Sequence, residues 1–392
     1  MLNTPFSPWP SYTQEEADAV AQVLLSNKVN YWTGAECREF ETEFAAWTGC
    51  NYAIALANGT LALDLALKAL NVGEGDEVIT TPRTFLASAS SIVMAGANPV
   101  FADVDLNSQV ITALSIEAML TDKTKAVIVV HLAGMPAEMD EIMALSDKYG
   151  FKVIEDCAQA HGAKYKGRSV GTIGHIGAWS FCQDKIMTTG GEGGMVTTND
   201  RSLWQFMWSY KDHGKSFDAI YNRQHPPGFR WLHESFGTNW RMTEMQAVIG
   251  RIQLKRMPEW TKKRQTYASR IDQAVSHIAL VRRVEVPGYS EHAEYKHYLF
   301  IEPEYLADGW NRDRIVNEIV QRGVPVFQGS CSEVYLEKAF ENTSWRPVSR
   351  LPNAIELGET SLMLLVHPTL IEDEIEQTVK ALTSVLLQAM KK

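Results

Sequence analysis

The sequence of 392 residues has few cysteines, no block of positive charge and no long apolar run. Its five cysteines are scattered without a C-x-x-C spacing, which argues against both a disulfide framework and a zinc site. We therefore expect reduced, mostly buried thiols and no bound metal. The formal net charge is −10, and no run of five lysines or arginines occurs. This charge pattern excludes the electrostatic footprint of a protein that binds nucleic acid or an anionic membrane surface.

The N-terminal residues are rich in proline and lack the basic segment followed by an apolar segment that marks a secretory signal. No apolar run approaches the roughly 18 residues of a membrane span. We expect a cytoplasmic protein that does not associate with membranes. The hydrophobic content of 45% is ample for a large core in a globular protein of more than one domain.

Short β-prone runs alternate with helical segments between residues 52 and 198. This alternation is typical of a mostly parallel sheet covered by helices on both faces, the α/β class. In such sheets ligands bind beyond the carboxyl ends of the strands. The expected strands are 52–56, 77–80, 99–104, 126–131, 152–155, 178–181 and 195–198, and the helices between them include 61–70, 84–94 and 139–149.

A change in pattern near Pro258 predicts a second domain. A strong helix is expected from about Thr243 to Met257, and the proline is interpreted as a boundary. Beyond it, helical and β-prone segments with a new set of apolar residues indicate a small α+β domain. We therefore expect a large domain over residues 1–257, including an N-terminal helix, and a small domain over residues 258–392.

The first candidate for chemistry is Lys185, a lysine between two β-prone runs. It lies five residues after Ser180 and is followed by a glycine-rich stretch at 190–194. Taken alone, such a lysine is more often a solvated loop residue. The alternative is an amine that condenses with an aldehyde, which requires partners elsewhere in the chain to hold that aldehyde.

Two further segments supply such partners. Asp156 ends a predicted strand, where its carboxylate either caps a helix or keeps a heteroaromatic nitrogen protonated. Gly59 and Thr60 follow another strand and begin a helix, whose N–H groups suit a phosphate together with the hydroxyls of Thr60 and Ser180. An aldehyde, a pyridine nitrogen and a phosphate are combined in pyridoxal 5′-phosphate. The three weak signals therefore support one another.

Recognisable motifs follow one another along nearly the whole chain. The main ones are Asn58-Gly59-Thr60, Thr81-Pro82-Arg83-Thr84-Phe85, Glu155-Asp156-Cys157-Ala158-Gln159-Ala160-His161-Gly162, Ser180-Phe181 with Lys185, Gly190-Gly191-Glu192-Gly193-Gly194, and Gly237-Thr238-Asn239-Trp240-Arg241-Met242. Their order resembles that of the DegT/DnrJ/EryC1/StrS family of sugar aminotransferases. The resemblance implies the fold-type I architecture of pyridoxal-phosphate-dependent transferases, with a seven-stranded, mostly parallel sheet and a small C-terminal α+β domain. It also implies a homodimer whose active sites use both subunits.

The same resemblance implies a role for each matching residue. Lys185 would condense with the aldehyde of pyridoxal 5′-phosphate and act as catalytic base and acid, and Asp156 would pair with the pyridine nitrogen. Gln159 would hydrogen-bond near the ring hydroxyl, and Phe85 would stack on the ring. The phosphate would be bound by Gly59, Thr60 and Ser180, joined by Asn239 from the partner subunit.

The expected reaction moves the amino group of glutamate to a carbonyl sugar and releases 2-oxoglutarate. The first candidate acceptor is a nucleotide-linked keto sugar, on the way to a surface polysaccharide such as an O-antigen or to lipopolysaccharide. The alternative is a free oxidised sugar acid, such as 8-oxo-3-deoxy-octulosonate, which would give 8-amino-3,8-dideoxy-octulosonate. Two other classes stay open, a sugar dehydratase and a cofactor-binding regulator without turnover. The dehydratases of this fold carry histidine at the position of Lys185, which argues against them.

Several side chains are candidates for contact with the substrate. Cationic groups suit a carboxylate or a pyrophosphate, and aromatic groups can line a site. The candidates are Tyr31, Trp32, Arg83, Lys211 and Arg230. For the aromatic pair the alternative is core packing, and for each cation it is an ordinary surface position.

Overall fold

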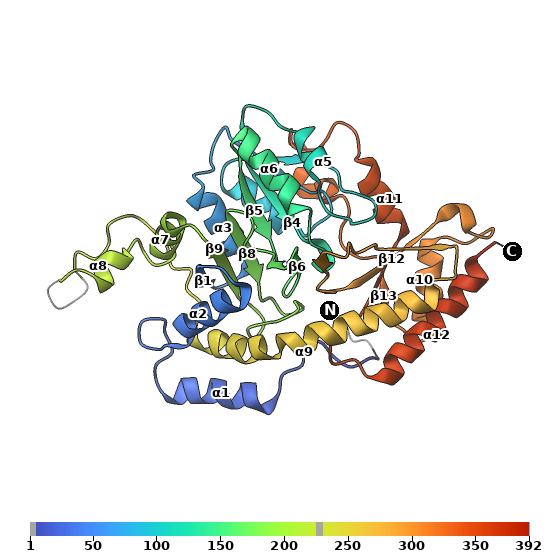
Figure 1. Ribbon diagram of the computed structural model, residues 1–392, viewed down its shortest axis with the longest axis horizontal. Coiled ribbons are helices and arrows are strands. Elements are labelled where there is room, and N and C mark those ends of the chain that lie inside the picture. The colour runs from blue at the N-terminus through green and yellow to red at the C-terminus, as the bar shows by residue number, and fades with distance from the viewer. Residues whose placement is uncertain (1–4, 225–229, 392) are drawn as a thin grey trace.

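The computed structural model describes residues 5–224 and 230–391 (Figure 1). Its largest sheet has seven strands in the order β1-β9-β8-β5-β4-β2-β3. Strand β9 runs antiparallel to both neighbours, and the other four pairs are parallel. The strands are β1 (Tyr52–Leu56), β2 (Glu77–Thr80), β3 (Asn98–Phe101), β4 (Thr124–Val130), β5 (Lys152–Asp156), β8 (Ile176–Ser180) and β9 (Gly194–Thr198). The mostly parallel sheet and all seven predicted strands are confirmed, with small differences at the strand ends.

The sheet is buried on both faces. Ile128 and Val130 of β4 pack into one hydrophobic cluster. Val127 and Val129 alternate with them, point to the opposite face and pack into a second cluster. This double burial explains why the sequence shows a continuous apolar run at β4 instead of a polar alternation.

Helices cover the sheet as the alternating pattern predicts. α2 (Glu36–Thr48) packs against β1, α3 (Gly59–Ala69) against β8 and β9, and α6 (Met139–Tyr149) against β5. The predicted N-terminal helix is α1 (Gln14–Leu25), where the carboxylate of Glu16 accepts a hydrogen bond from the N–H of Thr13 at 2.6 Å. The remaining helices of this part are α4 (Ala87–Met94), α5 (Ala113–Glu117), α7 (Arg201–Tyr210), α8 (Phe217–Tyr221) and the short 3-10 helix η1 (Leu132–Gly134).

Helix α9 (Glu244–Val275) runs along the molecule from α1 and α2 to the C-terminal part (Figure 1, yellow). The expected helix end at Met257 is wrong, because the helix continues through Pro258. Proline removes one helical hydrogen bond, but α9 packs against α1, α2 and α12 (Glu372–Ala389), and this packing outweighs the loss. The expected boundary between residues 257 and 258 therefore falls inside a continuous helix, and the domain limits stay a prediction.

The C-terminal part is a smaller α+β unit, as predicted. Its four-stranded antiparallel sheet has the order β10-β12-β14-β13. The strands are β10 (Val281–Arg283), β12 (His297–Ile301), β13 (Val326–Phe327) and β14 (Ser361–Leu364), and the further helices are α10 (Arg312–Val320), α11 (Pro352–Thr360), η2 (Pro303–Tyr305), η3 (Val334–Leu336) and η4 (Lys338–Phe340). Phe6, from the N-terminal end of the chain, packs into the core of this unit. A small third sheet joins β11 (Ser290–Glu291), β6 (Lys164–Tyr165) and β7 (Arg168–Ser169).

The cysteines are unpaired, as expected, and three of them, Cys37, Cys50 and Cys157, are buried. Among the residues that the structure describes, every helix is too short or too polar to cross a lipid bilayer.

A substitution at Gly177 in β8 would test how tightly the centre of the sheet is packed. A Cβ atom there would lie 2.4 Å from the carbonyl oxygen of Gly171 and 2.5 Å from Oγ1 of Thr197. Neither atom can retreat, because Thr197 Oγ1 donates a hydrogen bond to that same carbonyl at 2.6 Å. We expect Gly177→Ala to lower the free energy of unfolding by about 1–3 kcal/mol, measured by urea denaturation. Gly73→Ala is the control, since nothing lies within 4 Å of a Cβ there; equal losses in both variants would contradict the expectation.

Candidate active site

The two predicted catalytic residues come from adjacent strand ends. β5 and β8 are parallel neighbours, and Asp156, the last residue of β5, pairs with Ala178 of β8. β8 ends two residues later at Ser180, and the loop that follows carries Lys185. The structure therefore brings Asp156 and the loop of Lys185 to the same carboxyl edge of the sheet, where ligands of open α/β sheets bind.

Three segments converge beside this edge with no room for a further carbon atom. A Cβ on Gly59, at the start of α3, would lie 2.4 Å from the Cβ of Ser180. A Cβ on Gly194, at the start of β9, would lie 2.2 Å from the carbonyl oxygen of Asn58. Both glycines are needed for this close approach, which places the N-terminus of α3 directly against the end of β8.

The N-terminus of α3 forms a cradle that suits a phosphate. The side chain of Asn58 caps the helix by accepting a hydrogen bond from the N–H of Leu61 at 3.0 Å. This cap leaves the N–H groups of Gly59 and Thr60 as donors at the positive end of the helix dipole. The hydroxyl of Ser180 lies beside them. The donor set therefore fits the phosphate of pyridoxal 5′-phosphate.

Asp156 is held in a buried setting that suits a protonated ring nitrogen. Its carboxylate accepts hydrogen bonds from Oγ of Ser88 at 2.8 Å and from the N–H of Ala158 at 3.1 Å. Burial nevertheless raises the pKa of this carboxyl above its usual value, because these two bonds do not fully compensate the lost hydration. A cationic pyridinium opposite the carboxylate would supply the missing compensation.

Gln159 and Phe85 follow strand ends at this edge, and each has a group that could contact a ligand. The amide oxygen of Gln159 accepts a hydrogen bond from the N–H of Ala133 at 2.8 Å, which leaves the amide NH2 as a donor toward a ligand. Phe85 precedes α4, the helix that carries Ser88, and this residue is 70% exposed. An exposed aromatic ring here is suited to stacking on a ligand, although the roles of both residues stay predictions.

Lys185 is held by residues from distant parts of the chain. Its backbone oxygen accepts a hydrogen bond from Nε1 of Trp9 at 2.8 Å. Its Nζ lies 4.0 Å from Oδ1 of Asp184 and 5.3 Å from the centre of the Tyr295 ring. The hydroxyl of Tyr295 donates to the same carboxylate at 2.5 Å. Sequence reasoning missed these three partners; Asp184 was visible beside the lysine, but nothing local marked Trp9 or Tyr295.

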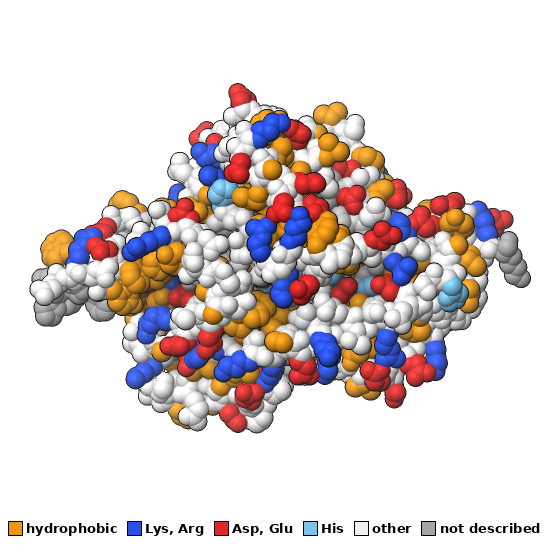
Figure 2. Space-filling model, viewed as in Figure 1, with side chains coloured by type: hydrophobic (Ala, Val, Ile, Leu, Met, Phe, Trp, Pro, Cys, Tyr) orange, Lys and Arg blue, Asp and Glu red, His pale blue; other side chains and the backbone are white. Residues whose placement is uncertain are grey.

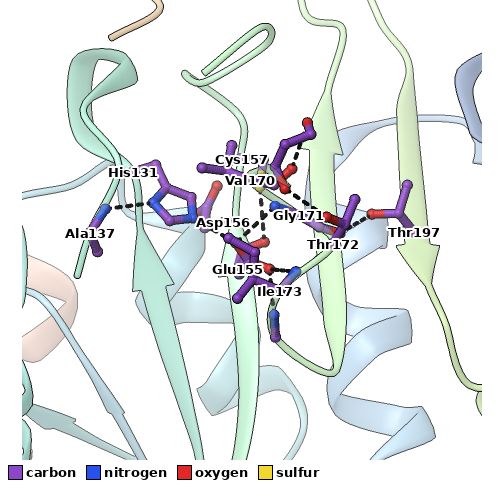
Figure 3. Close-up of polar contacts among 12 residues, drawn as sticks. His131, Ala137, Glu155, Asp156, Cys157, Val170, Gly171, Thr172, Ile173 and Thr197 are labelled. Atoms are coloured by element: carbon purple, nitrogen blue, oxygen red, sulfur yellow. Dashed lines mark hydrogen bonds and ion pairs between the residues drawn. The ribbon is translucent and has the colours of Figure 1, made fainter. Parts of the chain in front are cut away.

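Glu155, next to Asp156, is fully buried, points to the opposite face of the sheet and is the centre of a hydrogen-bond network (Figure 3). Its carboxylate accepts hydrogen bonds from the N–H groups of Gly171 at 2.8 Å, Ile173 at 2.8 Å and Gly174 at 2.6 Å. Nε2 of His131 lies 3.0 Å away. Burial alone would raise the pKa of Glu155, but His131 and the backbone donors outweigh it and lower the pKa. Glu155 therefore stays ionised and ties the turn at 171–174 to the end of β5.

The orientation of His131 follows from its second ring nitrogen. Nδ1 accepts a hydrogen bond from the N–H of Ala137 at 3.1 Å, so we infer that Nε2 carries the hydrogen that faces Glu155. Ligand atoms of His131, Glu155 and Cys157 lie within 4.8 Å of one another, a spacing that a metal ion can use. The hydrogen bonds account for the histidine and the glutamate without an ion.

The structure places three of the proposed substrate residues in the interior. Lys211 is fully buried, with its Nζ 3.1 Å from Oε1 of Glu41 and 3.7 Å from the centre of the Tyr31 ring. Tyr31 is itself 2% exposed and donates its hydroxyl hydrogen to Glu41. Arg83 is also fully buried and donates to Oε1 of Gln109 at 3.1 and 2.9 Å. The alternative of a surface position is therefore wrong for Arg83 and Lys211, and Tyr31 is packed in the core. Contact of these three residues with substrate stays a prediction.

The other predicted contacts lie nearer the surface. Trp32 is half-buried and packs against the rings of Tyr31 and Trp208. Arg230 is exposed, and the neighbouring residues 225–229 lie outside the described part of the chain. Asn239 is exposed and its backbone pairs with Asp212. Contact of Trp32 and Arg230 with substrate, and of Asn239 with a partner's phosphate, stay predictions.

Comparison with known proteins gives matches over nearly the whole chain. The sequence model of the DegT/DnrJ/EryC1/StrS aminotransferase family matches residues 10–383. The spore coat polysaccharide biosynthesis protein SpsC of Bacillus subtilis is 33% identical over 96% of each chain. GDP-perosamine synthase of Escherichia coli O157:H7 is 38% identical over 70% of this chain and 72% of its own. The crystal structure of an aminotransferase from Psychrobacter cryohalolentis superimposes with a TM-score of 0.96 at 65% identity, covering 98% of this chain and 100% of that one.

The contact of Gly59 with Ser180 predicts the effect of a single added methyl group. Gly59→Ala would push the N-terminus of α3 away from β8 and spoil the phosphate donors. We expect the affinity for pyridoxal 5′-phosphate to fall at least about tenfold, because losing one hydrogen bond to a charged group costs about 1.5–3 kcal/mol. Absorbance titration of the cofactor measures the change, with Gly73→Ala as the control. An unchanged dissociation constant in a folded Gly59→Ala variant would rule out this cradle.

Proposed function

Because the chain belongs to the DegT/DnrJ/EryC1/StrS aminotransferase family, and thus to the pyridoxal-phosphate-dependent sugar aminotransferases, we propose that it aminates a nucleotide-linked keto sugar with glutamate as donor. The observation that carries the proposal is the shared sheet edge, where Asp156, the loop of Lys185 and the N-terminus of α3 meet. The edge offers an amine, a carboxylate and a phosphate cradle, the three kinds of group that pyridoxal 5′-phosphate needs.

In this proposal, different residues of the chain bind different parts of the cofactor. The start of α3 and Ser180 hold the phosphate, Asp156 faces the ring nitrogen, and Lys185 holds the aldehyde end. When bound, pyridoxal phosphate supplies an electron sink that stabilises negative charge on the carbon that carries the amino group. Phe85 covers the ring, and the NH2 of Gln159 donates toward its hydroxyl.

Lys185 then acts as the proton carrier of the site. Its Nζ accepts the α-proton of the amino donor and later gives up that proton as an acid. Asp184 lies beside this amine, with its carboxylate 4.0 Å from Nζ and held in place by the hydroxyl of Tyr295. Burial acts to raise the pKa of Asp184, but Lys185 and Tyr295 outweigh it and keep that pKa low. Trp9 restrains the lysine backbone at the same time.

The name of one relative supports a nucleotide-linked acceptor, and the name of another supports a role in polysaccharide biosynthesis. One is a GDP-perosamine synthase, a name that specifies a nucleotide-linked amino sugar. Another is named for spore coat polysaccharide biosynthesis. We therefore propose a role in making an amino sugar for a surface polysaccharide or lipopolysaccharide.

A screen of acceptors tests the proposal. The purified protein, loaded with pyridoxal 5′-phosphate and given glutamate, is expected to aminate at least one nucleotide-linked keto sugar, with release of an equal amount of 2-oxoglutarate measured by mass spectrometry. Lys185→Ala is expected to lower the rate at least about 10²-fold, because it removes the general base and acid.

Other outcomes of this screen point elsewhere. Amination of oxidised sugar acids alone would contradict the proposed acceptor. A dehydrated product would indicate a dehydratase, and a cofactor that glutamate leaves unchanged would indicate a regulator. Near-normal amination by Lys185→Ala would overturn the assignment of the lysine.

We also propose that the chain forms a homodimer through the arm formed by the described residues 212–224 and 230–240. Helix α8 in this arm projects away from the sheet (Figure 1). Hydrophobic side chains gather over α7 and α8 on the face shown in Figure 2. Trp231 is 85% exposed and Phe236 is 98% exposed, an unusual cost for two large apolar side chains unless a protein surface covers them. Asn239, predicted to reach a partner's phosphate, lies in the same arm.

Charged substitutions in this arm are expected to change the oligomeric state. Wild-type protein is expected to sediment as a dimer, and the double variant Trp231→Glu with Phe236→Glu as a monomer, because two charges would be desolvated at the interface. Leu114→Glu is the matched control, since Leu114 in α5 is 80% exposed and lies outside the arm. A dimeric double variant, or a monomeric wild type, would exclude this interface.

A further inference from the structure

A second lysine lies beside the same aromatic ring as Lys185. Nζ of Lys296 is 4.9 Å from the centre of the Tyr295 ring, and Nζ of Lys185 is 5.3 Å from it. The segment that carries Lys296 comes from the C-terminal part and joins the large sheet's edge, because the N–H of Tyr295 donates to the carbonyl of Ala133 at 2.9 Å. Ala133 is also the partner of Gln159. Lys296 therefore belongs to the surroundings of the proposed reacting amine.

Lys296 forms no ion pair with any residue that the structure describes. It is 8% exposed, and within residues 5–224 and 230–391 it has no hydrogen bond and no carboxylate within 4.0 Å. Asp184 is the acidic group whose charge it feels, but that carboxylate is already engaged by Tyr295 and Lys185. Burial lowers the pKa of Lys296 to about 8, so the amine is still protonated at neutral pH.

A third buried cation adds to this excess of positive charge. Arg264 of α9 is 1% exposed and donates through Nη1 to the carbonyl oxygens of Glu294 and Tyr295 at 3.4 and 3.3 Å. Its Nε and Nη2 have no hydrogen-bond partner among the described residues. The carboxylate of Glu294 offsets this positive charge only in part, because it also faces the ring of His297 at 3.2 Å. Buried, unpaired charge of this kind is costly, and a bound anion would relieve it.

The position of the cluster limits which anion it receives. The cofactor phosphate has its own donors at the start of α3 and Ser180. In a nucleotide-linked sugar the sugar itself separates the phosphates from the reacting carbonyl carbon. In the amino donor, by contrast, the α-carboxylate is attached directly to the carbon from which Lys185 takes a proton. A carboxylate there would lie beside the reacting amine, where Lys296 is found.

We propose that Lys296 binds the α-carboxylate of the amino donor, with Arg264 reinforcing the positive potential behind it. This inference rests on the proposed function, because it takes Lys185 as the reacting amine. The carboxylate is present in glutamate and in 2-oxoglutarate but absent from a neutral sugar ring. Lys296 therefore sets the affinity for donor and co-product and leaves the affinity for the sugar acceptor alone.

Donor binding to the cofactor-loaded protein tests this role. The probe is α-methylglutamate, which carries both carboxylates but lacks the α-proton and so binds without turnover. We expect Lys296→Met to raise its dissociation constant at least about tenfold, measured by absorbance titration, because a charge-assisted hydrogen bond is lost. Lys296→Arg should restore most of the affinity. Lys263→Met, at an exposed position of α9, is the control and should match the wild type.

Acceptor kinetics provide the second readout. The KM for the sugar, measured with protein already in the pyridoxamine phosphate form, should be unchanged in Lys296→Met, while the KM for glutamate rises. If Lys296→Met does not fold, Lys296→Gln gives the same comparison with a polar side chain. An unchanged dissociation constant for α-methylglutamate, or an equal rise in both KM values, would overturn the inference. If glutamate does not convert the wild-type protein to its pyridoxamine phosphate form, the proposed function is overturned, and this inference with it.

Discussion

The close approach of Gly59 to Ser180 is the constraint on which the candidate site depends. With a Cβ only 2.4 Å from Ser180, any larger residue at position 59 would force α3 away from β8. Gly194 imposes the same limit from β9, because a Cβ there would meet the carbonyl of Asn58 at 2.2 Å. Two missing side chains thus bring a helix N-terminus to the edge of the sheet where the loop of Lys185 begins. These two packing contacts therefore position the proposed phosphate cradle beside the loop of the proposed reacting amine.

Electrostatics at the end of β5 complete the arrangement. Glu155 and Asp156 are adjacent, but alternation along the strand sends them to opposite faces and into different environments. Glu155 is satisfied by three backbone N–H groups and His131, which lower its pKa and hold the turn at 171–174. Asp156 has fewer donors, and burial raises its pKa. Glu155 therefore stabilises the strand end. Asp156 is incompletely compensated, and a cationic group of a ligand would stabilise its charge.

The features of the structure that depend on local sequence patterns could be predicted from the sequence. Apolar runs and turns identify all seven strands of the large sheet, and the glycines and polar residues at strand ends identify the candidate site. Position 258 shows the limit, because helix packing carries α9 through a proline that marks a boundary in the sequence. Burial of a cation is equally invisible: Lys211 and Arg83 are interior only because Glu41 and Gln109 lie opposite them. The partners of Lys185 from the N-terminal segment and the C-terminal part also depend on contacts between residues far apart in the chain.

The most direct test of the account is the identity of the lysine that holds the cofactor. The protein loaded with pyridoxal 5′-phosphate is reduced with borohydride, digested, and mapped by peptide mass spectrometry. The account predicts a single phosphopyridoxyl adduct, on Lys185. Three buried lysines, Lys211, Lys215 and Lys296, serve as internal controls in the same digest. An adduct on any of them, with Lys185 unmodified, would contradict the account.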